Sequence, residues 1–122
     1  MKYDDNNIFA KILRGEIPCK KIYEDDYALS FHDISAQKKI HALVIPKGKY
    51  IDLDDFNAKA SDKEIVGLIK GISIVAKKLD ISVDTGKGYR ALTNISENGG
   101  QEVPHLHVHL FGGERVGRMV SD

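Results

Sequence analysis

The chain has 122 residues, of which 42% are hydrophobic and 30% are charged, and these proportions are typical of one soluble globular domain. Eighteen basic residues balance eighteen acidic ones, which argues against a general binder of nucleic acid, because such proteins carry a basic excess. One cysteine allows no internal disulfide, and we find neither a signal-peptide pattern nor an apolar run near the about 18–20 residues that span a bilayer. We therefore expect a single cytoplasmic domain over residues 1–122 that binds neither nucleic acid nor membranes.

The first part of the chain predicts a short helix followed by three strands. Over residues 6–14, the apolar side chains fall on one face of a helix. Residues 20–24 and 27–32 predict two strands joined by an acidic turn. Residues 41–46 form an apolar run bounded by Pro46, which indicates a buried strand.

The clearest element of the second part is a long helix over residues 62–79. Its apolar residues recur every three or four positions, and Ser61 and Glu64 fit a capping box at its start. Gly67 and Gly71 lie inside this helix, where each costs about 1 kcal/mol relative to alanine. Their spacing of four residues indicates close approach to another element, and we consider a partner subunit as one possibility.

Two further strands complete the expected fold. Residues 89–94 and 105–111 predict strands, and residues 96–100 between them predict a loop. The strands mostly follow one another directly or through hairpins, with few helices between them. This arrangement favours an α+β fold with a largely antiparallel sheet.

Three of the five histidines alternate with apolar residues in the run HLHVHLF at residues 105–111. Alternation is the period of a strand, so we expect His105, His107 and His109 to project from one face of a single strand. One interpretation is zinc binding, since His-x-His on a strand presents two imidazoles to a metal, and His41, His107 and His109 are the candidate ligands. Another is nucleophilic catalysis, because imidazole is largely neutral near pH 7. A third interpretation is a row of exposed histidines on the surface that has no function.

A row of imidazoles also resists full protonation. Two unit charges about 7 Å apart repel by about 2.4 kcal/mol at an effective dielectric constant of 20. This repulsion lowers the pKa of the second ring by about two, so at least one ring stays neutral. The row can hold a neutral nucleophile beside a partial positive charge, and this combination suits attack on an anionic phosphate.

The run at residues 105–111 resembles the His-φ-His-φ-His-φ-φ motif of the histidine triad family, where φ is apolar. The similarity to the Hint branch, the histidine triad nucleotide-binding proteins, extends along nearly the whole chain. It includes residues 7–14 (NIFAKILR), 31–34 (FHDI), 41–46 (HALVIP), 88–94 (GYRALTN) and 99–113 (GGQEVPHLHVHLFGG). The glycine pair after the triad favours this branch over the Fhit-like diadenosine polyphosphate hydrolases.

The resemblance implies a five-stranded antiparallel sheet with one long and one short helix, assembled as a homodimer. It also implies binding of purine nucleoside monophosphates and hydrolysis of purine nucleoside phosphoramidates, such as adenosine 5'-phosphoramidate. The nucleophile would be His107, which attacks the α-phosphorus, expels the amine and forms a nucleotidyl-histidine that water then hydrolyses. This scheme requires no metal or other cofactor.

The resemblance also implies roles for the residues around His107. His109 would contact the phosphate and help to protonate the leaving amine, while His105 and His41 would form hydrogen-bonded support. Asp33 would bind the ribose hydroxyls. Phosphate oxygens would be held by Asn94 and by the backbone of Gly100, Gln101 and Glu102. An apolar slot for the base would be lined by Phe9, Ile12, Phe31 and Ile34, with His32 beside it.

Alternatives remain open at this point. The apolar residues assigned to the base slot could belong to the core, and Asn94 and Gly100 could form only a turn. Animal Hint proteins carry a serine at the position of Glu102, where a carboxylate beside a phosphate is unfavourable. The competing functions are a dinucleoside polyphosphate hydrolase and a non-catalytic protein that binds nucleotides or zinc for regulation.

Overall fold

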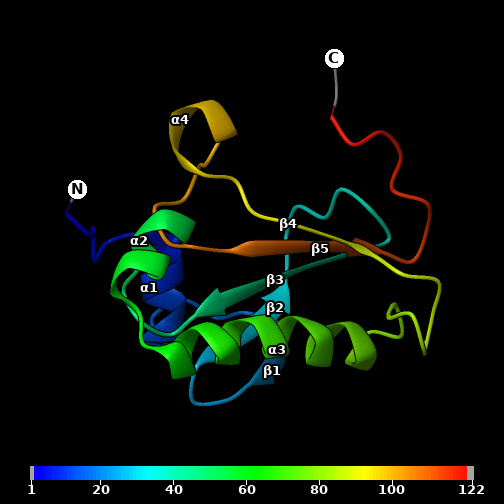
Figure 1. Cartoon of the computed structure of the whole chain (residues 1–122), viewed down its shortest axis with the longest axis horizontal. Coiled ribbons are helices and arrows are strands. Elements are labelled where there is room, and N and C mark those ends of the chain that lie inside the picture. The colour runs from blue at the N-terminus through cyan, green and yellow to red at the C-terminus, as the bar shows by residue number, and fades with distance from the viewer. Residues whose placement is uncertain (1, 121–122) are drawn as a thin grey trace.

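Residues 2–120, the part of this computed structural model that we describe, form four helices and one five-stranded sheet (Figure 1). The helices are α1 (Ile8–Leu13), α2 (Leu53–Lys59), α3 (Asp62–Lys78) and α4 (Ser96–Gly99). The strands are β1 (Lys21–Glu24), β2 (Ala28–His32), β3 (Ile40–Pro46), β4 (Arg90–Leu92) and β5 (Val108–Gly112). None of the helices in this range is long and apolar enough to cross a membrane.

The sheet has the strand order β1-β2-β3-β5-β4, and every neighbouring pair is antiparallel. The predicted α+β fold with a five-stranded antiparallel sheet is therefore confirmed. The two central strands, β3 and β5, pair over five positions, with Leu43 opposite His109 and His41 opposite Phe111. This register makes His41 and His109 diagonal neighbours, a separation that long or aromatic side chains bridge.

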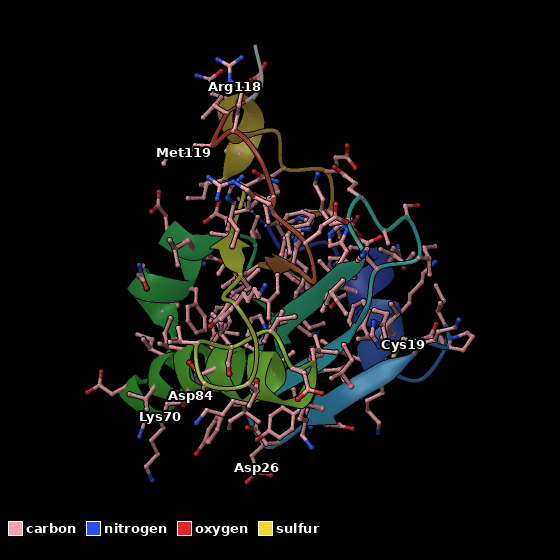
Figure 2. All side chains as sticks on the ribbon, turned by 90° about the vertical axis from the view of Figure 1, so that its right-hand side faces the viewer. Cys19, Asp26, Lys70, Asp84, Arg118 and Met119 are labelled. Atoms are coloured by element: carbon pink, nitrogen blue, oxygen red, sulfur yellow. The ribbon has the colours of Figure 1, made fainter. Side chains whose placement is uncertain are left out.

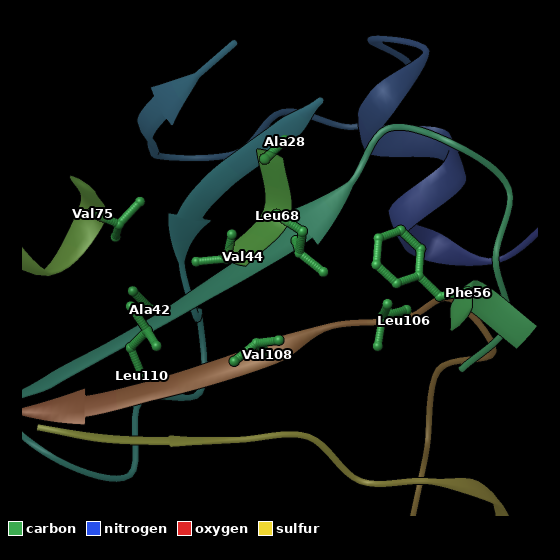
Figure 3. Packing of buried hydrophobic residues seen from close by; sticks show 9 residues of the cluster. All are labelled: Ala28, Ala42, Val44, Phe56, Leu68, Val75, Leu106, Val108 and Leu110. Carbon is green, nitrogen blue, oxygen red and sulfur yellow. The ribbon is translucent and has the colours of Figure 1, made fainter. Parts of the chain in front are cut away.

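One face of the sheet packs against α3. Ala42 and Val44 from β3 and Leu110 from β5 are fully buried in this layer with Leu68 and Val75 of the helix (Figure 3). The capping box predicted at the start of α3 is present, since Ser61 and Glu64 each bond to the other's backbone N–H. Removal of these apolar side chains from water stabilises the packing of helix on sheet.

The two glycines of α3 face the sheet of the same chain. A β-carbon built on Gly67 would lie 2.6 Å from the β-carbon of Tyr27, and one built on Gly71 would lie 3.6 Å from that of Ala28. The expected close approach is confirmed, but the neighbour is the start of β2. The glycine pair therefore provides no argument for a subunit interface.

The other face of the sheet packs against α1. Side chains that alternate with the α3-facing ones, Leu43 and Ile45 of β3 and Phe31 of β2, form a second buried cluster with Phe9 of α1. Because successive side chains of a strand point to opposite faces, His41 and His109 also lie on this α1 face.

The structure differs from the sequence prediction in its helices. The sequence predicted two helices, whereas the structure has four. The additional helices, α2 and α4, are too short to show a helical period in the sequence. Asp52 caps α2 by accepting a hydrogen bond from the Asp55 N–H, and the helix buries Phe56. The second unexpected helix, α4, is a four-residue turn within the predicted loop.

The histidine run is also less regular than predicted. The last strand begins at Val108 rather than at His105, so His109 is the only histidine of the run within β5. Pro104 has no N–H to donate to a ladder, and the chain turns here, with the His105 N–H bonded to the Val103 carbonyl. Leu106 then bonds to the Tyr50 carbonyl outside the sheet. The expectation that all three histidines lie on one strand is therefore wrong.

Candidate active site

Four of the five histidines gather on the α1 face of the sheet, although two of them precede β5. His41 Nε2 lies 2.9 Å from His109 Nδ1, and the ring centres of His107 and His109 are 5.1 Å apart. His105 connects to this group through its backbone carbonyl, which lies 2.7 Å from His107 Nδ1. The alternation of residues 105–109 is thus kept in space without a continuous strand.

His107 is held as one tautomer by its neighbour in the chain. A carbonyl oxygen can only accept, so His107 Nδ1 carries the proton that is donated to the His105 carbonyl. The lone pair of the neutral ring is therefore on Nε2. Phe9 packs edge-on against the ring at 4.9 Å, and Thr93 donates its hydroxyl proton to the His107 carbonyl at 2.7 Å. Both contacts limit the movement of a candidate nucleophile.

The charge state of His107 also suits nucleophilic attack. Burial lowers its pKa below the ordinary value for histidine. The hydrogen bond to the His105 carbonyl and the charges of Asp33 and Glu102 oppose this effect in part. The ring is neutral at physiological pH, because its pKa lies below that range.

His41 and His109 form a pair whose proton positions follow from their partners. The Gln37 N–H donates to His41 Nδ1 at 3.1 Å, so the proton of the neutral His41 ring is on Nε2. This N–H donates to His109 Nδ1, and Asp33 Oδ2 lies 3.3 Å from the same nitrogen. The neutral His109 ring therefore carries its own proton on Nε2, where it can donate to a ligand.

His109 is neutral in the free protein. Burial is the main cause that lowers its pKa to about 4, followed by the neighbouring rings of His107 and His41, while Asp33 raises it. The pKa of His41 is also lowered, chiefly by burial. Because His109 and His41 are neutral in the free protein, the negative charge of a bound phosphate can raise their pKa values and so change their protonation.

His105 supports the cluster from inside the protein. It is completely buried, with Nε2 bonded to the Pro46 carbonyl at 2.9 Å and Nδ1 bonded to the Tyr3 hydroxyl at 2.6 Å. Burial is the main cause that lowers its pKa to about 4. Because the His105 ring is fully buried and both of its nitrogens form hydrogen bonds, it cannot contact a ligand. Any influence of His105 on a ligand is therefore indirect.

Among residues 2–120, the ligating atoms of Asp33, His41 and His109 lie within 4.8 Å of one another, close enough to surround a metal ion. This set differs from the predicted His41, His107 and His109. The donor chemistry disfavours a cation here. A neutral His41 could ligate through Nε2 only with its proton on Nδ1, which already accepts the Gln37 N–H. A metal at this position would have to break that hydrogen bond.

The residues predicted to bind the nucleoside lie in different environments. Phe9 and Phe31 pack edge-to-face with ring centres 5.7 Å apart in the buried cluster, and Ile12 is partly buried against it. Asp33 follows β2 and accepts the Ser35 N–H through Oδ1. Ile34 is 94% exposed, so nothing in the described chain covers its side chain.

His32 is the predicted residue that the structure does not bring to the site. It is exposed and lies opposite Ala42 in the β2–β3 ladder. Directly opposed residues share a face, and Ala42 is buried against α3. The His32 side chain is therefore directed to the face opposite His41 and His109.

The predicted phosphate-binding backbone is only partly available. The Gly100 and Gln101 N–H groups donate to the carbonyls of Glu97 and Ser96, so in this conformation both already have partners within the chain. The Gln101 side chain bonds to the carbonyls of Ile51 and Val103, which fixes the loop. These bonds leave the Glu102 N–H as the predicted donor that remains.

A cavity of about 580 Å³ opens beside His109. Asn94 lines it, as do the cationic residues Lys38 and Arg90. The C-terminal segment contributes the other wall through Val116 and Met119. Arg90 holds this segment by donating hydrogen bonds to the carbonyls of Gly117 and Arg118. Figure 2 shows Arg118 and Met119 at one end of the molecule, with Asp26 and Lys70 at the other.

Some of the residues that hydrogen-bond to the histidine cluster were not predicted, among them Tyr3, Gln37 and Thr93. Tyr3 reaches His105, Gln37 donates to His41, and Thr93 donates to the His107 carbonyl. Gln37 acts through its backbone, so its side chain carries no signal. The position of Thr93 next to the predicted Asn94 was the one sequence signal that could have indicated its role. No sequence pattern connects Tyr3 with His105, which lies 102 positions later.

The fold and the histidine cluster together define a histidine triad protein. A model of the HIT domain matches residues 14–116, so the chain belongs to the HIT domain family. An uncharacterized 13.2 kDa HIT-like protein of Azospirillum brasilense is 53% identical over 119 residues, which are 98% of this chain and 95% of the relative.

Solved structures agree with this assignment. A HIT family hydrolase from Clostridium thermocellum is 33% identical, with a TM-score of 0.85 over 97% of this chain and 99% of the relative. A histidine triad protein from Clostridium difficile is 36% identical, with a TM-score of 0.81 over 98% of this chain and all of the relative's. The likeness extends over almost the whole of each chain.

Proposed function

We propose that this protein is a Hint-branch hydrolase of purine nucleoside phosphoramidates with His107 as the nucleophile. The observation that carries the proposal is the bond between His107 Nδ1 and the His105 carbonyl, 2.7 Å long, which places the lone pair of a neutral ring on Nε2. A neutral imidazole with its lone pair directed away from the backbone is the form that attacks phosphorus.

The first step transfers the nucleotidyl group to the enzyme. His107 Nε2 forms a bond to the α-phosphorus while the bond from phosphorus to the amine nitrogen breaks. The leaving nitrogen takes a proton from His109 Nε2, so a neutral amine departs. The product is a nucleotidyl-imidazolium on His107, whose Nδ1–H still donates to the His105 carbonyl.

Protonation of His109 is brought about by the substrate. A phosphate charge about 4 Å from this ring favours its protonated form by about 4 kcal/mol at an effective dielectric constant of 20, which raises the pKa by about three. A pKa of about 4 in the free protein then moves near neutrality. Asp33 Oδ2, 3.3 Å from His41 Nε2, accepts the His41 N–H when His109 Nδ1 becomes protonated.

The second step restores the enzyme. Water attacks the phosphorus, the bond from phosphorus to His107 Nε2 breaks, and His109 Nε2 takes the proton that the water loses. The nucleoside monophosphate leaves, His107 is neutral again, and His109 releases to solvent the proton that it took up when the substrate bound. No step needs a metal, which agrees with the donor arrangement at His41.

Recognition of the nucleotide follows from the residues around the cluster. We propose that Asp33 accepts hydrogen bonds from the ribose hydroxyls, because a carboxylate can accept from both at once. Of the four apolar residues predicted to line the base slot, Ile12 and Ile34 remain open to a base, whereas Phe9 and Phe31 are buried. Asn94 and the Glu102 N–H remain for the phosphate. A homodimer, suggested by the family resemblance alone, is part of this proposal.

The decisive experiment is an intact-mass measurement after the protein is mixed with adenosine 5'-phosphoramidate and quenched. We expect an adenylyl adduct on His107 in the native chain and none in His107→Ala, which should still bind AMP. Turnover by His107→Ala at the native rate would contradict the proposal. Binding of AMP without any turnover of a panel of phosphoramidates would favour the regulatory alternative.

A dinucleoside polyphosphate hydrolase is the second candidate, favoured by the charge of the cavity beside His109. Lys38 and Arg90 line this cavity, and cations there would suit a polyphosphate leaving group better than a neutral amine. Comparison of kcat/KM for adenosine 5'-phosphoramidate and diadenosine tetraphosphate separates the two functions. Lys38→Ala should weaken only the second substrate, since Lys38 would contact the leaving group.

A further inference from the structure

We propose that Tyr3 is a positioning residue for the reaction, which locks His105 and through it the tautomer of His107. The proposal rests on the proposed function for its kinetic consequences. Its structural basis is independent of substrate: the Tyr3 hydroxyl lies 2.6 Å from His105 Nδ1, and the two rings pack edge-to-face at 5.7 Å.

The direction of the hydrogen bond between Tyr3 and His105 is fixed. His105 Nε2 faces the Pro46 carbonyl at 2.9 Å, so this nitrogen carries the proton of the neutral ring. Nδ1 therefore has the lone pair, and Tyr3 must donate. Burial raises the pKa of Tyr3, so its hydroxyl keeps this proton at neutral pH.

His105 passes this constraint to His107 through its backbone. Bonds at both ring nitrogens hold the His105 side chain in a site with no solvent access. The carbonyl of the same residue accepts the His107 Nδ1 proton at 2.7 Å. Movement of residue 105 would misplace this acceptor, and the His107 proton could then move to Nε2, the atom that must attack.

The segment that carries Tyr3 is itself anchored. The Asn7 side chain donates to the Asp4 carbonyl at 2.7 Å, and Arg14 donates to the Asp5 carbonyl at 2.8 Å. Lys49 pairs with the Asp5 carboxylate at 2.8 Å. These contacts join residues 4 and 5, which follow Tyr3 directly, to the two ends of α1 and to the segment after β3, so Tyr3 meets His105 from an anchored segment.

The test is Tyr3→Phe, which removes one oxygen and keeps the ring, with Tyr89→Phe as the matched control. Tyr89 is a partly buried tyrosine that packs against the core on the α3 side of the sheet. We expect Tyr3→Phe to lower kcat about tenfold with little change in KM, in line with the losses seen when a partner that orients a functional histidine is removed. The control should match the native chain.

A second readout separates positioning from a general effect on the fold. The ¹⁵N chemical shifts of the imidazole nitrogens report which nitrogen carries the proton. In Tyr3→Phe we expect His107 to change from one tautomer to a mixture, while the backbone amide spectrum stays native-like. A fall in kcat with an unchanged His107 tautomer would overturn the proposal, as would no change in either.

These measurements also separate this proposal from the proposed function. If the native chain turned over no phosphoramidate, the proposed function would fail, and the ring-nitrogen shifts alone would decide the role of Tyr3. If the native chain were active and Tyr3→Phe equally active with one His107 tautomer, the role of Tyr3 would fail and the function would stand.

Discussion

His41 donates its Nε2 proton to His109 Nδ1 across 2.9 Å, and the direction of this bond is set by the backbone N–H of Gln37 on the other side of the His41 ring. The consequence is that the His109 proton is on Nε2, available to a leaving group. His41 therefore influences the reaction through its hydrogen bond to His109.

Replacement of His41 by phenylalanine should impair proton transfer to the leaving group. Without its partner at Nδ1, the His109 ring is no longer held with Nε2 directed at the leaving group. We expect His41→Phe to lower kcat by about 10–100-fold for an alkylamine phosphoramidate. The loss should be far smaller for an arylamine, which departs without full protonation. Equal losses with both leaving groups would contradict this role.

Sequence patterns predicted the sheet face of this site but not its hydrogen bonds. The alternation of residues 105–109 correctly brings His107 and His109 together, with ring centres 5.1 Å apart, although β5 begins only at Val108. The tautomers depend on the Pro46 carbonyl and the Gln37 N–H. Backbone groups occur at every position, so only the tertiary structure shows which of them a ring meets.

Glu102 should weaken phosphate binding by its charge. It is exposed in the loop before the histidine run, and its charge raises the pKa of His107 against the effect of burial. We expect Glu102→Gln to lower KM and the Kd for AMP about two- to fivefold, the effect of one partly screened surface charge. The gain should shrink in high salt. The control is Glu97→Gln in α4, and a larger KM in Glu102→Gln would show that its carboxylate assists binding.

His105 should make the fold less stable in mild acid. Its pKa is about 4 in the folded protein against 6.5 for an ordinary histidine, so between these values the unfolded chain binds a proton that the folded chain does not. The free energy of unfolding therefore falls as pH decreases from 6.5 to 4. A pKa difference of about 2.5 corresponds to about 3 kcal/mol.

The measurement of this effect is urea unfolding at pH 7 and pH 4.5 for the native chain and for His105→Gln. The variant lacks the titrating ring, so its loss of stability between the two pH values should be smaller by most of that amount. Carboxylates titrate in both proteins and cancel in the comparison. Parallel losses in the two chains would show that His105 contributes nothing to the acid sensitivity.

The two glycines of α3 should respond oppositely to alanine. At Gly71 the new β-carbon would lie 3.6 Å from that of Ala28, an ordinary contact, so Gly71→Ala should stabilise the protein by up to about 1 kcal/mol through helix propensity. At Gly67 it would lie 2.6 Å from the Tyr27 β-carbon, which cannot move without β2. Gly67→Ala should therefore destabilise by about 1–3 kcal/mol, as overpacking does. Thermal unfolding of both variants tests the packing of α3 on the sheet. If Gly67→Ala were as stable as Gly71→Ala, the close approach of Gly67 to Tyr27 would not constrain the packing of this helix.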